Sequence, residues 1–300
     1  MCGSHSRRRF LKAGLSLGGL VLAPQCFAAG EGGRLPRVSL VVLSDTHLGY
    51  QGKERAAEQW ELTATEVNKV PADLVLHLGD IVDGGREEQY PVYLRTRGKI
   101  DKPVHEIPGN HDPAELFEKY IRKPIATVVE HEWLRLLLLG NARRESHDGF
   151  LSPAQLAWIE AQSREAKQEN RYVALCMHVP AHTNRHPDRG WYIKPEHGQK
   201  ELYEIVARHQ ERILCLMHGH FHNGIRGWDD HAPVHEVVFP SALYNKTRRL
   251  EEQMAPGYNL PEFRPGFTSL VIERGVMRLR FHPLGAEPSV EKSLSLAQLR

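Results

Sequence analysis

Five short apolar runs along the chain end at residues that can bind a metal ion. Their high content of valine, isoleucine and leucine predicts buried β-strands. The runs lie at residues 38–43, 74–78, 104–107, 172–177 and 213–217. A cluster that contains aspartate, asparagine or histidine follows each run within a few residues. The run at 74–78 is central to our interpretation, because it leads to Asp80, which we place between two metal ions.

Helical patterns separate several of these strands. Residues 53–70 and 200–209 have helical character. Ser152 and Gln155, spaced as in a capping box around a proline, predict the start of another helix. Further strands are predicted at 126–131, 133–139, 233–239, 268–273 and 276–281, the last two joined by a hairpin turn at 274–275. Alternating strands and helices indicate an α/β fold, in which ligands bind at the carboxyl edge of the sheet.

The first residues differ in character from the rest of the chain. Arg7 and Arg8 precede a mildly apolar stretch at 13–23, and small residues follow it. The stretch resembles a bacterial twin-arginine export signal. A membrane anchor or an ordinary first helix is the alternative, but a span requires about 20 apolar residues. We therefore predict a signal peptide at 1–29, one domain at 30–300, and no stable membrane span in the mature form.

The predicted signal has two consequences. The protein would use the twin-arginine translocase as a partner during export and would reside in the periplasm or outside the cell. Removal of residues 1–28 would delete four basic residues and no acidic one, so the formal charge would change from +2 to +2 − 4 = −2. A chain without net positive charge does not attract nucleic acid in general, and we expect no nucleic-acid partner.

The overall composition restricts the possible folds and functions little further. With 300 residues, 41% of them apolar and 25% charged, the chain can bury the core of one large globular domain. Two of its cysteines fall within the predicted signal, and Cys176 and Cys215 lie in apolar runs. Buried free thiols are the default for such positions, although an oxidising compartment would permit a bond between them.

The polar clusters provide seven candidate ligands of suitable chemistry. They are Asp45, His47, Asp80, Asn110, His178, His220 and His222. Carboxylate, amide and imidazole groups without a thiolate suit Mn, Fe or Zn ions and differ from a cysteine-rich structural zinc site. Any one of these histidines could simply be hydrogen-bonded at a strand end. Their joint occurrence in this order, each near a strand end, favours a metal centre.

These residues resemble the calcineurin-like metallophosphoesterases. The family pattern is Asp-x-His, Gly-Asp-x-x-(Asp or Tyr), Gly-Asn-His-(Asp or Glu), His and Gly-His-x-His, and the resemblance covers residues 38–239. It implies a four-layer αββα sandwich of two mixed β-sheets flanked by helices, classed as α/β or α+β. It also implies a binuclear centre of two divalent or mixed-valence metal ions.

The resemblance further implies a role for each residue. One ion would be held by Asp45, His47, Asp80 and His222, and the other by Asp80, Asn110, His178 and His220. A hydroxide bridging the two ions would attack phosphorus, while Asn110 holds phosphate oxygens. His111 would stabilise or protonate the leaving oxygen, with Asp83 orienting its ring.

Three positions differ from the motifs of particular branches of the family and so narrow the type of phosphoesterase that we expect. Gly84 occupies the position at which protein serine/threonine phosphatases have a phosphate-binding arginine, and Asp112 replaces their glutamate. Asp83 stands where purple acid phosphatases have a tyrosine. The motifs are most similar to those of bacterial phosphodiesterases grouped with the class III cyclic-nucleotide enzymes.

The sequence indicates less about the substrate than about the metal centre. We expect a small organic phosphate, and we interpret loop 181–200 as a specificity loop in which Arg185, Trp191 and Tyr192 contact the substrate. The alternative for this loop is a solvated surface segment. Two alternatives to the small-molecule phosphoesterase also stay open: a non-catalytic metal-binding scaffold of the same fold, and a phosphodiesterase acting on phospholipid or nucleic acid.

Overall fold

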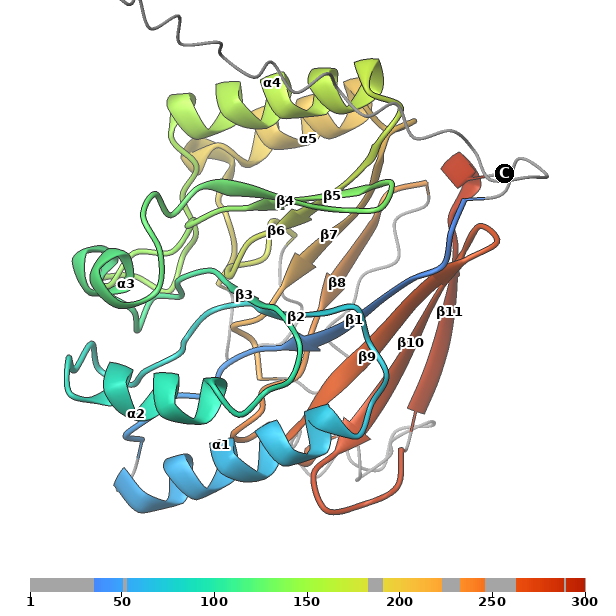
Figure 1. Cartoon of the computed structure of the whole chain (residues 1–300). Coiled ribbons are helices and arrows are strands. Elements are labelled where there is room, and N and C mark those ends of the chain that lie inside the picture. The colour runs from blue at the N-terminus through green and yellow to red at the C-terminus, as the bar shows by residue number, and fades with distance from the viewer. Residues whose placement is uncertain are drawn as a thin grey trace, which may run out of the picture.

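The computed structural model describes residues 35–50, 53–182, 191–222, 233–245, 263–288 and 290–299. Two mixed β-sheets face each other, and helices cover their outer faces (Figure 1). The strand orders are β11-β10-β9-β1-β2-β3 in the first sheet and β4-β5-β6-β7-β8 in the second. The predicted four-layer arrangement is confirmed. The predicted signal at 1–29 lies outside the described residues.

The first sheet combines a parallel and an antiparallel part. The parallel strands are β1 (Val38–Leu43), β2 (Leu74–His77) and β3 (Val104–Glu106). The antiparallel strands are β9 (Gly266–Glu273), β10 (Val276–Pro283) and β11 (Val290–Ser295). The helices of this half are α1 (Lys53–Asn68), α2 (Gln89–Arg97) and α3 (Ala114–Tyr120). In Figure 1, α1 and α2 lie along the outer face of this sheet.

The second sheet follows the same plan. Its strands are β4 (Thr127–His131), β5 (Leu134–Leu138), β6 (Tyr172–Cys176), β7 (Ile213–His218) and β8 (His235–Val238). Only the β4–β5 pair is antiparallel. Two helices, α4 (Pro153–Gln168) and α5 (Gln199–Arg208), cover its outer face (Figure 1). Single-turn 3₁₀ helices occupy Pro195–His197 and Ala297–Leu299.

The central strands are buried on both faces. Leu40 and Leu136 pack in the core between the sheets, whereas Val41 and Leu137 pack against the helical layers. A strand covered on both sides is apolar at every position, and this explains the continuous apolar runs in the sequence. Cys176 and Cys215 are buried free thiols.

The structure agrees with most of the predicted elements and adds three. The capping box at α4 is complete, because Ser152 Oγ accepts the Gln155 N–H at 3.2 Å and Gln155 Oε1 accepts the Ser152 N–H at 2.9 Å. The sequence did not predict α2, α3 or β11. Helix α2 buries polar Gln89 and Thr96 together with its tyrosines and so lacks an apolar stripe. Strand β11 is an edge strand in which only Leu294 is buried.

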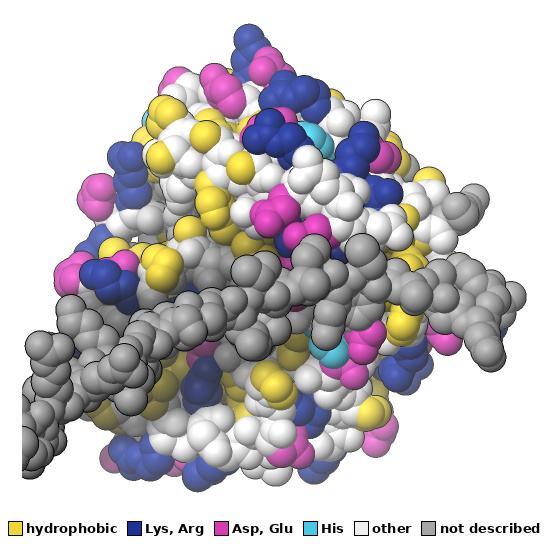
Figure 2. All heavy atoms as spheres, turned by 45° about the horizontal axis from the view of Figure 1, so that its top comes forward, with side chains coloured by type: hydrophobic (Ala, Val, Ile, Leu, Met, Phe, Trp, Pro, Cys, Tyr) yellow, Lys and Arg dark blue, Asp and Glu magenta, His cyan; other side chains and the backbone are white. Residues whose placement is uncertain are grey.

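The surface carries charges of both signs. On the face drawn in Figure 2, lysine and arginine side chains are interspersed with aspartate and glutamate side chains among the described residues. No helix within the described ranges is both long enough and apolar enough to cross a membrane.

Candidate metal centre

The candidate ligands meet where the chain leaves the carboxyl ends of β1, β2, β3, β6 and β7. The segments that follow β1 and β2 stay hydrogen-bonded, because the Asp45 N–H donates to Gly79 O and the His47 N–H to Asp80 O, each at 2.9 Å. The two sheets are connected at this edge, where the His220 N–H donates to Asp45 Oδ2 at 3.1 Å. Residues far apart in the sequence therefore converge through backbone contacts.

The first donor group consists of Asp45, His47, Asp80 and His222, all buried. One ligand atom from each lies within 4.8 Å of the others. His222 Nε2 is 3.0 Å from Asp45 Oδ1 and 3.1 Å from His47 Nε2, and His47 Nε2 is 3.5 Å from Asp80 Oδ2. Two carboxylates and two imidazoles at these distances could hold one cation.

The second donor group consists of Asp80, His178 and His220. His178 Nε2 lies 3.2 Å from Asp80 Oδ2 and 3.2 Å from His220 Nδ1. Asn110 is buried and precedes His111, whose N–H donates to Asp80 Oδ1 at 2.8 Å. Asp80 therefore belongs to both groups.

Five of these candidate ligands adopt a backbone conformation that is uncommon outside glycine. Their φ angles lie between 42° and 74°, at Asp45, His47, Asp80, His220 and His222. A side chain in this left-handed region costs roughly 1–3 kcal/mol. The surrounding backbone hydrogen bonds hold these residues there, which is typical of positions whose side-chain direction matters more than their contribution to stability.

The donor groups are strongly coupled electrostatically. Burial alone would lower the pKa of His47, but the carboxylates of Asp80 and Asp45 raise it to about 10. Burial would likewise lower the pKa of His178, and Asp80 raises it to about 9. Burial would raise the pKa of Asp80, yet the histidines hold it well below its ordinary value. Without a metal ion, protons balance the carboxylates, and a bound cation would replace them.

Other hydrogen bonds orient two of the imidazoles from behind. His178 Nδ1 lies 2.6 Å from the Leu78 carbonyl oxygen, and His222 Nδ1 lies 2.9 Å from the Tyr244 carbonyl oxygen. In the neutral form that binds a metal ion, a ring that donates from Nδ1 to a carbonyl presents an unprotonated Nε2 on its other side. Both histidines are therefore set to offer Nε2 to a metal ion.

The donor set fits two metal ions. Within the described part of the chain, the buried oxygens Asp45 Oδ1 and Asn110 Oδ1 have no hydrogen-bond donor. Such atoms are costly to bury unless a cation or another partner satisfies them. The absence of thiolate ligands and the presence of carboxylate, amide and imidazole groups suit Mn, Fe or Zn ions.

His111 lies at the edge of the first donor group with Asp83. Asp83 Oδ1 is 3.1 Å from His111 Nδ1 and 3.4 Å from His47 Nδ1, so one carboxylate supports a half-exposed ring and a buried one. Burial would raise the pKa of Asp83, but its contacts with His111 and His47 hold the pKa well below its ordinary value. Asp83 therefore stays ionised and can orient both rings.

Asp112, the last residue of the Gly-Asn-His-Asp motif, joins two loops of the first sheet. Its Oδ2 accepts the N–H groups of Ile81 at 3.0 Å and Gly109 at 2.9 Å, and its Oδ1 accepts the Val82 N–H at 3.1 Å. The Tyr90 hydroxyl lies 3.4 Å from Oδ1. These contacts fix the loop after Asp80 against the loop that carries Asn110.

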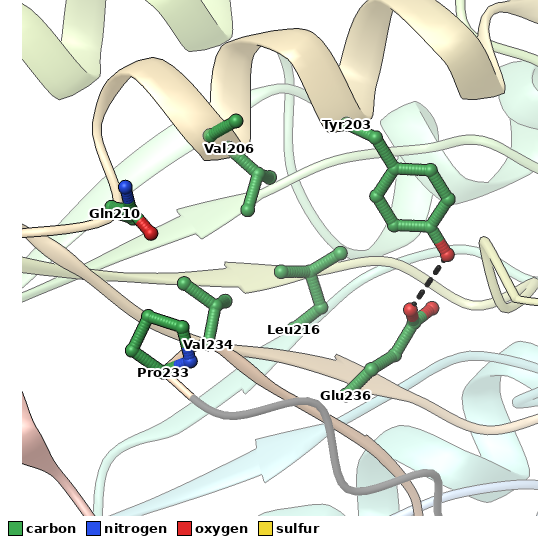
Figure 3. A pocket seen from close by; sticks show the side chains of 8 residues that line it. Tyr203, Val206, Gln210, Leu216, Pro233, Val234 and Glu236 are labelled. Carbon is green, nitrogen blue, oxygen red and sulfur yellow. Dashed lines mark hydrogen bonds between the residues drawn. The ribbon is translucent and has the colours of Figure 1, made fainter.

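Glu236 has a comparable place in the second sheet, which the sequence did not reveal. Its Oε1 accepts the N–H groups of Ala181 and His182 at 2.9 and 3.0 Å and lies 2.9 Å from His218 Nε2. Its Oε2 accepts the Tyr203 hydroxyl at 2.9 Å, beside an apolar cavity of about 360 Å³ between α5 and β7–β8 (Figure 3). Burial would raise the pKa of Glu236, but His218 and the amides lower it to about 2.

Two glycines allow the loops to approach closely. A Cβ on Gly109 would lie 2.1 Å from Asp80 Oδ1, and a Cβ on Gly219 would lie 1.9 Å from Ser44 Oγ. No side chain can occupy either position without displacing the candidate ligands. Glycine is therefore required at both positions of the Gly-Asn-His and Gly-His motifs, because there is no room for a side chain.

The three predicted substrate-binding residues have different outcomes. The Trp191 ring lies beside the second donor group, 5.3 Å from the His220 ring between centroids. Tyr192 instead packs under Lys194, whose Nζ is 3.8 Å from the ring centroid. Arg185 lies within 183–190, outside the described residues.

The structure also places aromatic residues that the sequence did not single out beside the donor groups. The His147 ring stacks on Trp191 with centroids 4.1 Å apart. On the other side, the Tyr244 ring lies 4.4 Å from His222 and stacks with Tyr50 at 5.1 Å. Tyr50 follows the first motif by three residues, which was a possible signal, whereas His147 and Tyr244 lie in no motif.

Comparison with known sequences agrees with this geometry. Residues 38–224 match the family described as calcineurin-like phosphoesterase. A probable glycerophosphodiester phosphodiesterase of Arcobacter nitrofigilis is 30% identical over 207 residues, which cover 61% of this chain and 71% of that protein. A probable cyclic nucleotide phosphodiesterase of Rhodopseudomonas palustris is 27% identical over 214 residues, covering 66% and 76%.

Solved structures share the fold at low sequence identity. A dimetal phosphatase from Danio rerio superposes with a TM-score of 0.64 at 14% identity, covering 87% of this chain and 99% of that one. A purple acid phosphatase from yellow lupin seeds gives a TM-score of 0.64 at 12% identity, covering 87% and 54%. These likenesses establish the arrangement of the sheets and helices.

Proposed function

The chain belongs to the calcineurin-like phosphoesterase family, and from this premise we propose that it is an exported, two-metal phosphodiesterase acting on a small organic phosphate. The observation that carries the proposal is the pair of donor groups that share Asp80, with His111 at their edge. A single ion would need only one such group. Two groups with a common carboxylate suit two ions that act on one phosphate.

The residues of the candidate centre would have distinct roles in metal binding and catalysis. Asp45, His47, Asp80 and His222 would hold one ion, and Asp80, Asn110, His178 and His220 the other. Bound there, two cations would neutralise phosphate charge and make water nucleophilic near neutral pH. Asn110 would orient a phosphate oxygen through its side-chain amide. His111, with Asp83 at its Nδ1, can present a proton to the leaving oxygen from its other ring nitrogen.

The names of the relatives favour a diester substrate. Relatives at 24–30% identity are named as glycerophosphodiester or cyclic nucleotide phosphodiesterases. In an alkyl ester, whether diester or monoester, the alkoxide leaving group departs poorly without a proton, and His111 is placed to supply one. The Trp191–His147 stack beside His220 offers a flat surface that suits an aromatic substituent, which is consistent with a nucleotide.

Export rests on the sequence pattern of residues 1–29. Folded, metal-containing proteins are typical cargo of the twin-arginine route, and Arg7 and Arg8 stand in the required positions. Cell fractionation of the wild type and of an Arg7→Lys, Arg8→Lys double variant tests this part. Retention of the variant in the cytoplasm is expected, and normal amounts in the periplasm would refute it.

A substrate panel tests the activity. Purified protein loaded with Mn²⁺ is assayed with 3′,5′-cyclic AMP, glycerophosphoethanolamine, bis(4-nitrophenyl) phosphate and 4-nitrophenyl phosphate. We expect the diesters to be hydrolysed at least about tenfold faster than the monoester, measured as kcat/KM. Full metal occupancy without hydrolysis of any ester would favour the scaffold alternative. Preference for phospholipid or nucleic acid in a parallel assay would favour the other.

A further inference from the structure

The segment between β5 and α4 brings a guanidinium group to the edge of the candidate site. Arg144 is exposed, and its Nη2 donates to the Gly84 carbonyl oxygen at 3.1 Å. Gly84 follows Asp83 directly, and its N–H points at His111 Nδ1 at 3.2 Å. Arg144 thus contacts the turn that carries the Asp83–His111 pair, although it lies 60 residues away from that turn in the sequence.

The turn is shaped to receive this side chain. Gly84 and Gly85 have φ angles of 63° and 65°, a conformation that favours glycine. A Cβ on Gly85 would lie 2.9 Å from Arg144 Cζ. The missing side chain at Gly85 therefore leaves room for the guanidinium plane against the turn.

The charge of Arg144 is not used within the described part of the chain. No carboxylate there lies within 4.0 Å of it, whereas Arg135 has three such partners, Glu130, Glu165 and Glu169. Its hydrogen bond to Gly84 occupies one N–H group, and the other donors of the guanidinium have no hydrogen-bond partner within the described residues. A held guanidinium with open donors is suited to binding a carboxylate or phosphate through two parallel hydrogen bonds.

The neighbouring arginine provides a contrast. Arg143 places its guanidinium 3.4 Å from the centroid of the Phe150 ring, on its own segment. The two residues have the same charge and adjacent positions, but only Arg144 touches the turn beside His111. Their difference separates a local effect at the site from the general effect of positive charge.

We propose that Arg144 binds a second anionic group of the substrate, a carboxylate or phosphate outside the phosphoryl group that reacts. The proposal rests on the proposed function and extends it by naming a substrate class, organic phosphodiesters with two anionic centres. The reacting phosphate would sit at the buried donor groups, whereas Arg144 is exposed and bound to the outer turn. It therefore meets the organic part of the ester at the edge of the site.

Two substrates that differ by one carboxylate test this inference. The kcat/KM values for glycerophosphoserine and glycerophosphoethanolamine are compared in the wild type, Arg144→Gln and Arg143→Gln proteins. The wild type should favour the serine ester, and Arg144→Gln should lower the ratio of the two values about tenfold or more. Arg143→Gln should leave the ratio unchanged. An unchanged ratio in Arg144→Gln, or an equal fall in Arg143→Gln, would overturn the proposal.

A binding measurement separates this inference from the proposed activity. Calorimetric titration of each protein with the same two esters reports affinity without turnover, and thermal unfolding confirms that the variants fold. If the wild type hydrolyses neither these two esters nor any other ester of the substrate panel, the proposed function fails, and the inference is decided by binding. Tighter binding of the serine ester that depends on Arg144 supports it. Equal affinities for the two esters in the wild type, or a difference that survives in Arg144→Gln, refute it.

Discussion

The two sheets contribute unequal halves to the candidate centre. Among the described residues, the first sheet supplies the carboxylates at the site, Asp45, Asp80 and Asp83, together with His47, Asn110 and His111. The described residues of the second sheet that join the donor groups are the imidazoles of His178, His220 and His222. Negative charge therefore comes from one side of the molecule, and the other side contributes imidazole nitrogens.

The halves are supported in different ways. Behind the first, Asp112 is surrounded by backbone N–H groups and one tyrosine hydroxyl, and no imidazole is among its hydrogen-bond partners within the described residues. Behind the second, Glu236 combines two backbone N–H groups with the ring of His218. The first half is thus anchored within its own loops, whereas the second also depends on the contact between Glu236 and the His218 ring at the end of β7.

This difference predicts unequal consequences of mutation. A substitution in the first half should remove negative charge that stabilises the bound cations. It should therefore weaken the binding of both ions or slow the catalysed reaction. A change behind the second half should act mainly on stability and loop position. Three experiments, from the largest expected effect to the smallest, test this division.

The largest effect is expected for Asp80→Asn, because Asp80 is the residue common to both donor groups. The variant should lose about a thousandfold or more in kcat and bind less of both metal ions, since an amide gives up the shared negative charge. Metal analysis after dialysis measures the content. His178→Ala is the matched comparison from the second half and should deplete mainly one ion. Full occupancy of both ions in Asp80→Asn would contradict the bridging assignment.

An intermediate effect is expected for His111→Asn, which leaves the donor groups complete. Loss of a proton donor should slow hydrolysis of alkyl or nucleotide diesters about 10²–10⁴-fold, but that of bis(4-nitrophenyl) phosphate far less, because nitrophenolate departs unaided. Asp83→Asn should show the same order more weakly, since Asp83 lies 3.1 Å from His111 Nδ1.

The two measurements distinguish the possible roles of His111. Metal content should stay normal in His111→Asn, because the residue belongs to neither donor group. Equal losses on both classes of ester would mean that His111 binds phosphate instead of donating a proton. Loss of metal would mean that its role is structural. Metal binding and proton donation in the first half would then not be separable, contrary to what the geometry indicates.

The sequence allowed prediction where chemistry and local pattern coincide. The motif residues were recognisable because each follows an apolar strand, and the structure brings Asp45, His47 and Asp80 together with the histidines of the second sheet. The Ser152–Gln155 capping box was equally local and is present.

Contacts between distant segments were not predictable in this way. Glu236 reads as one acid within a strand, yet its N–H donors come from residues 54 and 55 positions earlier. Arg144 and His147 belong to a loop without a motif. The packing of the two sheets brings Arg144 to Gly84, whereas His147 meets Trp191 where two loops of the second sheet lie side by side. Helix α2 was missed because its buried face is partly polar.

The smallest effect on catalysis is expected for Glu236→Gln, which keeps the shape of the side chain but removes its charge. The folded-state pKa of Glu236 is lowered to about 2, below an unfolded value near 4.5. Its contribution is therefore present above pH 4.5 and is lost as the pH falls through about 2. The shift corresponds to on the order of 3 kcal/mol in the free energy of unfolding at pH 7.

Denaturant unfolding tests this prediction. The free energies of unfolding of wild type and Glu236→Gln should differ most at pH 7 and less at pH 3. The Tyr203→Phe variant, which keeps the charge, should show no such convergence. A gap that does not change with pH would mean that Glu236 acts through packing alone, and the two halves would then be supported in the same way.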